Sequence, residues 1–319
     1  MNLSLFGAAG PGPELRARLR ALAGEGIYLG ASSWKYEGWL GSVYSPERYL
    51  ARGRFSRKKF ESECLAEYAE TFPAVCGDFT FYQFPSGETW RRLFATAPPG
   101  LQFGFKAPEE VTVAEWPAHA RYGTRGGREN ESFLNAELFI RGFLTPLAPY
   151  RDRAGTVIFE FGAFSRRKYP SGGQFGRDLG RFLAQLPRGW RFAVEVRNAE
   201  FFEPEYFDIL RAHNAAHVFN AWTRTPPLES QVLIEEAYTA DFLVVRALLR
   251  QGRAYAEAVK RFEPYREIQD PNPGARAAIK TIIERARSKR QLAFVFVNNR
   301  LEGNAPGTIQ AVVESLPAG

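Results

Sequence analysis

The stretch Arg191–Asn198 places two opposite charges on one face of a predicted buried strand. Side chains alternate between the two faces of a strand, so Glu195 and Arg197 point to the same side. Val194 and Val196 point to the other side. A charged pair at the end of an apolar strand is costly unless it is hydrogen-bonded or solvated. The carboxyl end of a strand is also where α/β proteins usually bind ligands, so the pair is either part of a functional site or a structural ion pair.

Other predicted strands end in the same way, with polar or aromatic side chains after an apolar run. Besides Glu195 and Arg197, we expect the following residues to share one rim at the carboxyl ends of the strands: Trp34, Asp78, Tyr82, Lys106, Glu160, Asn220, Arg246 and Asn298. The strands are otherwise apolar, which favours a single polar region rather than scattered surface charges.

These residue types suggest acid–base chemistry on an anionic molecule. Glu160 and Glu195 are the candidate catalytic acid and base, since a buried carboxyl can have its pKa moved toward the working pH. The candidate substrate-binding residues are cations for an anionic group, amides for neutral polar groups, and rim aromatics: Lys106, Arg197 and Arg246, Asn220 and Asn298, Trp34 and Tyr82. The same charges could instead form a purely structural ion-pair network.

No cofactor motif stands out in the chain. Asp78 could hold a divalent metal ion together with Glu160 and Glu195, because hard cations take oxygen ligands, but nothing in the spacing supports this specifically. The three histidines do not form a zinc-binding cluster. Gly-x-Ser-x-Gly and Walker motifs are absent from the sequence. We therefore predict no cofactor.

Short β-rich runs alternate with helical patterns eight times after Ile27, which predicts a (β/α)8 TIM barrel. The predicted strands are Ile27–Ser33, Val75–Phe81, Leu101–Ala107, Thr156–Phe161, Arg191–Asn198, Ala216–Trp222, Phe242–Leu248 and Leu292–Asn298. The predicted helices are Phe60–Glu70, Glu88–Thr96, Ser132–Ala148, Phe175–Leu186, Glu205–His213, Leu228–Glu236, Gly274–Lys289 and Gly307–Leu316. An open doubly wound sheet is the competing architecture, but no strand is followed by a Gly-x-Gly-x-x-Gly turn.

The connections in this pattern also favour a barrel with its site at one end. Those from helix to strand are short, whereas the first and third strands are followed by the long loops Trp34–Lys59 and Pro108–Glu131. In TIM barrels such loops surround the active site at the carboxyl ends of the strands. We expect the aromatic part of the first loop, Trp34–Tyr44, to cover the site.

Composition indicates a soluble protein of the cytoplasm. The chain of 319 residues has no run of about 18 apolar residues for a membrane helix, and its first residues do not resemble a secretory signal. Cys64 and Cys76 do not suggest a disulfide framework. The formal charge of +7 is spread along the chain, which favours a small anionic ligand over nucleic acid as the partner. The sequence does not indicate an oligomeric state.

Several motifs, in order along the chain, resemble those of the domain of unknown function 72 family, the YecE-like proteins. They are Gly30–Trp34, Val43–Pro46, Phe79–Ser86, Phe103–Pro108, Val194–Asn198 and Phe296–Asn299. The resemblance implies a TIM-barrel domain over residues 27–319, preceded by an extension of residues 1–26 with a short helix. It implies no settled activity. Because the chain departs from the family's usual pattern at Cys76 and Glu160, the residue roles above rest on the strand ends alone.

Together these patterns predict an enzyme of hydrolase or lyase type that acts on a small polar, anionic substrate at the carboxyl end of the barrel. The alternative is a non-catalytic binding module for nucleic acid or a phosphorylated ligand. Salt dependence separates the two hypotheses, because nucleic-acid binding weakens steeply as salt rises.

Overall fold

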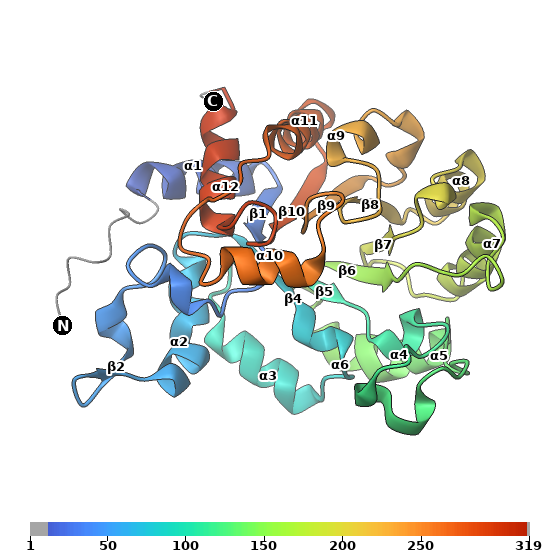
Figure 1. Ribbon diagram of the computed structural model, residues 1–319, viewed down its shortest axis with the longest axis horizontal. Coiled ribbons are helices and arrows are strands. Elements are labelled where there is room, and N and C mark those ends of the chain that lie inside the picture. The colour runs from blue at the N-terminus through green and yellow to red at the C-terminus, as the bar shows by residue number, and fades with distance from the viewer. Residues whose placement is uncertain (1–11, 318–319) are drawn as a thin grey trace.

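Eight parallel strands close into a barrel in the computed structural model, which describes residues 12–317 (Figure 1). In chain order they are β1 (Ile27–Ala31), β4 (Ala74–Gly77), β5 (Gln102–Lys106), β6 (Ala154–Phe161), β7 (Phe192–Val196), β8 (Ala216–Ala221), β9 (Phe242–Ala247) and β10 (Leu292–Val297). β1 pairs with β10 and with β4, which closes the ring. The predicted TIM barrel is therefore confirmed.

Helices surround the barrel and connect its strands. They are α1 (Pro13–Gly24), α2 (Arg57–Ala69), α3 (Gly87–Thr96), α4 (Glu109–Thr112), α5 (Ala136–Phe139), α6 (Thr145–Leu147), α7 (Gly172–Leu183), α8 (Pro204–Ala212), α9 (Leu228–Gln231), α10 (Tyr255–Phe262), α11 (Pro273–Lys289) and α12 (Ala305–Ser315). A small hairpin of β2 (Leu50–Ala51) and β3 (Arg54–Phe55) lies in the long loop after β1. Short turns are η2 (Glu37–Trp39), η3 (Pro46–Tyr49), η4 (Asp78–Phe81), η5 (Ala120–Arg125), η6 (Ile140–Leu144), η7 (Ala148–Arg153), η8 (Ala199–Phe201) and η9 (Glu235–Ala237).

Large aromatic side chains fill much of the barrel interior. Phe294 and Phe296 of β10 are buried there with small residues such as Ala74 and Ala193. A Cβ atom on Gly104 of β5 would lie only 2.5 Å from the ring of Phe296, so glycine makes room for that ring. The interior is thus packed rather than hollow, and the charged side chains lie at the carboxyl ends of its strands.

The second strand ends earlier than the sequence predicts. β4 stops at Gly77, and Asp78–Phe81 forms the turn η4 instead of continuing the strand. The buried hydroxyl of Thr80 donates to the backbone oxygens of Gly77, at 3.0 Å, and Lys106, at 2.6 Å. These hydrogen bonds hold the turn against the end of β5, so the prediction that the strand continues to Phe81 is wrong.

Several helical predictions also need correction. The helix predicted at Leu228–Glu236 ends at Gln231 as α9. The single helix predicted at Ser132–Ala148 is divided into α5, the π-turn η6 and α6. Pro146, in the first turn of α6, has no amide hydrogen for a regular helix, which accounts for part of this division. Helix α10 was not predicted, although Ala258 and Phe262 have the i, i+4 spacing of a packed helix face.

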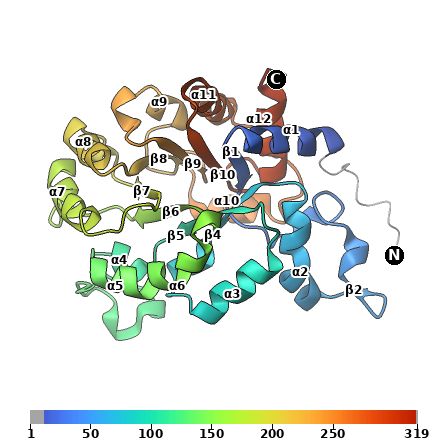
Figure 2. The same cartoon turned by 180° about the vertical axis from the view of Figure 1, so that it is seen from behind.

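Helices α1 and α10 lie at opposite ends of the barrel. α10 is in front of the strands in Figure 1, and α1 is in front in the reverse view of Figure 2. Leu15, Leu19 and Leu22 of α1 are buried in the main core. α10 packs through a smaller cluster that includes Trp222 at the end of β8, so α10 helps to cover the carboxyl end.

Candidate functional site

Six charged side chains meet at the carboxyl end of the barrel. We call this group the polar layer; it consists of Asp78, Lys106, Glu160, Glu195, Arg197 and Arg246. Strand register explains the meeting, because Glu160 of β6 lies directly opposite Glu195 of β7. Both side chains face the barrel interior, one level above the apolar layers.

Arg246 lies at the centre of the polar layer and is only 2% exposed. Its Nη1 atom donates to Oε2 of Glu160 at 2.6 Å and also to Oε2 of Glu195. Its Nη2 lies 3.6 Å from Oδ1 of Asp78. Burial opposes the charged form of Arg246, but the two glutamates outweigh it and raise the pKa of its guanidinium above the ordinary range. Arg246 therefore stays charged and holds the two glutamates together.

Arg197 joins the same glutamates from the open side of the layer. Its Nη2 lies 2.9 Å from Oε1 of Glu160 and 3.2 Å from Oε1 of Glu195. The plane of its guanidinium group lies against the Trp222 ring, with 3.6 Å between Cζ and the ring centroid. Among residues 12–317, no hydrogen bond uses its Nε or Nη1. Arg197 thus keeps unused donors beside two carboxylates.

Lys106 and Asp78 complete the polar layer. The Lys106 ammonium lies 2.9 Å from Oε2 of Glu160 and 3.8 Å from Oδ1 of Asp78. It also lies 3.9 Å above the ring of Phe81, which sequence reasoning missed. Asp78 is the most exposed member, with 40% of its side chain accessible, and both of its ion pairs are longer than 3.5 Å.

The cations of the polar layer keep Glu160 ionised. Burial opposes ionisation, but Arg197, Lys106 and Arg246 outweigh it and hold the pKa of Glu160 well below its usual range. Below this network, burial raises the pKa of the Cys76 thiol to about 12, so this thiol is protonated at neutral pH. With three carboxylates and three cations, the polar layer is balanced in charge. An ionised Glu160 suits an electrostatic role better than that of a proton donor.

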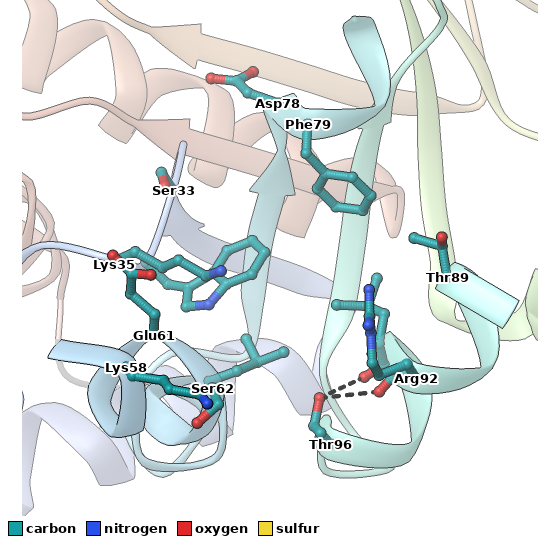
Figure 3. A pocket seen from close by; sticks show the side chains of 13 residues that line it. Ser33, Lys35, Lys58, Glu61, Ser62, Asp78, Phe79, Thr89, Arg92 and Thr96 are labelled. Atoms are coloured by element: carbon teal, nitrogen blue, oxygen red, sulfur yellow. Dashed lines mark hydrogen bonds between the residues drawn. The ribbon is translucent and has the colours of Figure 1, made fainter. Parts of the chain in front are cut away.

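A groove of about 570 Å³ opens beside the polar layer, between α2 and α3 (Figure 3). Figure 3 shows Lys58 and Ser62 of α2 on one side and Arg92 of α3 on the other, with Asp78 at the head. Both helices begin with a serine cap: Ser56 accepts from the Lys59 amide and Ser86 from the Thr89 amide. Asp78 belongs to both the groove and the polar layer.

Residues 28–318 match the sequence profile of a family described as "Protein of unknown function DUF72". The chain belongs to the DUF72 family. It is 24% identical over 177 residues to the UPF0759 protein YecE of Escherichia coli (strain K12), a match that covers 55% of this chain and 50% of YecE. The chain thus spans about half the length of the curated relatives it matches.

Solved structures support the fold of this DUF72 protein. A DUF72 family protein from Thermotoga maritima MSB8 aligns with a TM-score of 0.57 and 21% identity, over 89% of this chain and 96% of that chain. One from Enterococcus faecalis V583 aligns with a TM-score of 0.59 and 15% identity, over 92% of this chain and 98% of that chain. At these identities the likeness establishes the barrel architecture and nothing about activity.

The predicted amides of this DUF72 protein are engaged in the fold. Asn298 is buried, donates to the Ser32 hydroxyl, and accepts from the Arg300 amide at 2.9 Å. Asn220 is also buried and donates weakly to the backbone oxygens of Val196 and Val218. Its side-chain oxygen has no hydrogen-bond partner among the described residues. These contacts favour a structural role for Asn298, whereas Asn220 retains a free acceptor.

The predicted aromatics take different positions. Trp34 is 8% exposed and lines the groove rather than the polar layer. Tyr82 is 58% exposed at the rim, where the Arg121 guanidinium lies 4.4 Å from its ring centroid. Trp39 and Tyr44 of the first loop are buried and stacked together. These two rings therefore pack the loop onto the barrel and do not cover the polar layer.

The donor set of the polar layer differs from that of a typical metal site. Within residues 12–317, no group of three or more His, Cys, Asp or Glu side chains is arranged to hold a metal ion. The oxygens of Glu160 and Glu195 face guanidinium and ammonium groups, which a bound cation would have to replace.

In the same part of the chain, no helix has the length and apolar character required to cross a membrane.

Proposed function

We propose that the polar layer is the active site of a hydrolase or lyase type enzyme that acts on a small polar substrate carrying an anionic group. The proposal rests on one observation: the Nη1 donor of Arg197 forms no hydrogen bond among the described residues, although Nη2 of the same guanidinium group pairs with the ionised Glu160. Guanidinium groups bind carboxylate and phosphate groups through two parallel hydrogen bonds. A substrate anion that approaches Nη1 therefore need not displace the glutamates from Nη2.

Each charged residue has a distinct role in this proposal. Arg197 and Lys106 bind the anionic group, because their side chains are 14% and 8% exposed, against 2% for Arg246. Asp78 accepts a proton from the substrate or from water, since it is the most exposed carboxylate of the layer. Glu160 stabilises positive charge that develops in the reaction. Glu195 is a positioning residue, because it is fully buried and contacts Arg197 and Arg246.

This assignment modifies the roles expected from the sequence. Glu160 and Glu195 were expected to be the catalytic acid and base, and their participation stays a prediction. The low pKa of Glu160 makes it a poor proton donor at neutral pH, and a buried Glu195 cannot meet a substrate without rearrangement. We expect the enzyme in the cytoplasm, in keeping with its two free cysteines.

Turnover of a metabolite mixture tests the proposal. Purified protein is incubated with a cell metabolite extract, and mass spectrometry follows which anionic compounds are consumed. We expect the native protein to consume at least one of them, and Asp78→Asn to do so about 100-fold more slowly, because a lost general base typically has this effect. Arg197→Gln should be similarly impaired.

The matched control is Arg188→Gln, which removes the same charge from an exposed position at the opposite end of the barrel. It should leave turnover unchanged. If the native protein consumes no anionic compound, the enzyme proposal fails. Retained binding of an anionic metabolite would then favour the alternative of a non-catalytic binding module.

A further inference from the structure

We infer that the groove between α2 and α3 binds a planar organic anion and forms a second subsite next to the polar layer. The groove's role as a substrate subsite rests on the proposed function, whereas its capacity to bind such an anion does not. The substrate would then have two parts: a polar reactive part at the polar layer, and a flat apolar part with its own negative charge in the groove.

The charge of the groove favours an anion. Lys35, Lys58 and Arg92 line it, and none of them has an ion-pair partner within residues 12–317. Glu61 also lines the groove, but its carboxylate lies 3.0 Å from Arg57. The only other acid in the lining is Asp78, which faces the polar layer. Three cations, from β1's loop, α2 and α3, thus line the groove beside two acids, and neither acid forms an ion pair with any of them.

The apolar part of the lining favours a flat ring. Trp34 and Phe79 supply aromatic surfaces, and Leu65 and Leu93 add aliphatic ones. Aromatic side chains prefer offset-stacked or edge-to-face contact with other rings. A volume of about 570 Å³ lies within the range of small-molecule sites in proteins. Inorganic phosphate alone would leave these apolar surfaces uncovered.

Asp78 makes the groove continuous with the polar layer. It lines the groove, and its Oδ1 lies 3.8 Å from Lys106 and 3.6 Å from Arg246. A ligand that fills the groove therefore ends at the residue to which we assign proton transfer. This arrangement would select elongated substrates over small symmetrical anions, because only the former contact both regions.

Calorimetric titration with 1-naphthyl phosphate tests the inference. This probe carries a flat apolar ring and an anionic group, whereas 1-naphthol lacks the charge and inorganic phosphate lacks the ring. We expect saturable binding of 1-naphthyl phosphate, with about tenfold weaker binding for either fragment. The double variant Lys58→Gln/Arg92→Gln should weaken binding of the probe by about tenfold, because two charge-assisted contacts are lost.

The matched control is Arg91→Gln on the same helix. Arg91 is exposed, pairs with Glu88 and does not line the groove, so its substitution should leave affinity unchanged. The inference is overturned if 1-naphthyl phosphate shows no saturable binding, or if the double variant binds it as tightly as the native protein.

Two further outcomes separate this inference from the proposed function. If only Arg197→Gln weakens binding, the probe sits in the polar layer; the groove inference is then wrong, and the enzyme proposal stands. If the groove variants weaken binding but the native protein consumes no metabolite, the groove is supported and the enzyme proposal fails.

Discussion

The polar layer and the groove each contain three cationic side chains, but the two sets differ in their ion pairs. Lys106, Arg197 and Arg246 of the polar layer each contact at least two carboxylates. The groove cations, Lys35, Lys58 and Arg92, contact none within the described part of the chain. The first set is fixed in position by the fold, and the second is available to a ligand.

Burial explains this difference. Arg246 is 2% exposed and Glu195 is fully buried, and an unpaired charge at such a depth is strongly destabilising. The groove cations are exposed to water, so they require no partner. A set of paired charges therefore has a structural purpose whether or not it is catalytic, and function in the polar layer must come from the donors and acceptors left over.

The largest expected effect is on stability, after removal of a buried charge from the polar layer. Glu195→Gln leaves Arg246 with only one close carboxylate in a buried position. The free energy of unfolding should fall by about 3–5 kcal/mol, measured by denaturant titration. In the groove, Glu61→Gln should change it by less than about 0.5 kcal/mol, as is usual for exposed positions. Equal effects of the two substitutions would contradict the comparison.

Acid should lower the free energy of unfolding through the ion pairs of the polar layer. Burial opposes ionisation of Glu160, but its cationic neighbours lower its pKa in the folded protein. Such a carboxylate contributes stability above its unfolded pKa of about 4.3, and this contribution is lost as pH falls toward the folded value. The free energy of unfolding should thus fall below about pH 4.3 in the native protein, and fall less in Glu160→Gln. Denaturant titrations across this pH range measure both slopes.

A buried histidine must be separated from this effect. Burial lowers the pKa of His217 to about 3, so the unfolded chain binds a proton at higher pH than the folded one. His217 therefore also reduces stability as pH falls from about 6.5, but it does so equally in the native protein and in Glu160→Gln. Arg92→Gln should keep the native pH profile. A native slope in Glu160→Gln would show that the ion pairs of Glu160 do not cause the acid loss.

The polar layer could be predicted from the sequence because it depends on a local rule. Alternation along each strand places Glu160, Glu195 and Arg246 on inward faces, and parallel pairing brings the strand ends to the same level. The helix–strand repeat was sufficient to predict the closed barrel. What the strand pattern could not show is which carboxylate each cation contacts, since that depends on side-chain packing across the barrel.

The groove could not be predicted in the same way. Its cations lie on α2, α3 and a loop, so their proximity arises only after the barrel closes and the two helices pack side by side. Asp78 was identified, but its place in a strand was wrong because Thr80 stabilises a turn through a nonlocal hydrogen bond to the Lys106 backbone. Helix α10 buries two residues, Ala258 and Phe262, in a small separate cluster, so its apolar face is a weak signal in the sequence.

A matched pair of arginine substitutions gives the smallest expected effects and the sharpest contrast between the two regions. Arg197→Gln removes two carboxylate contacts and the stacking on Trp222, so the free energy of unfolding should fall by about 2–3 kcal/mol. Arg92→Gln removes no ion pair and should change it by less than about 0.5 kcal/mol.

Thermal and denaturant unfolding of both variants measure this contrast directly. If Arg92→Gln destabilised the protein as much as Arg197→Gln, Arg92 would have an interaction in the fold that the groove geometry does not include. Its charge would then no longer be available for a ligand. If only Arg197→Gln destabilises the protein, the positive charge around the groove is not needed for folding, and a binding role is its simplest physical explanation.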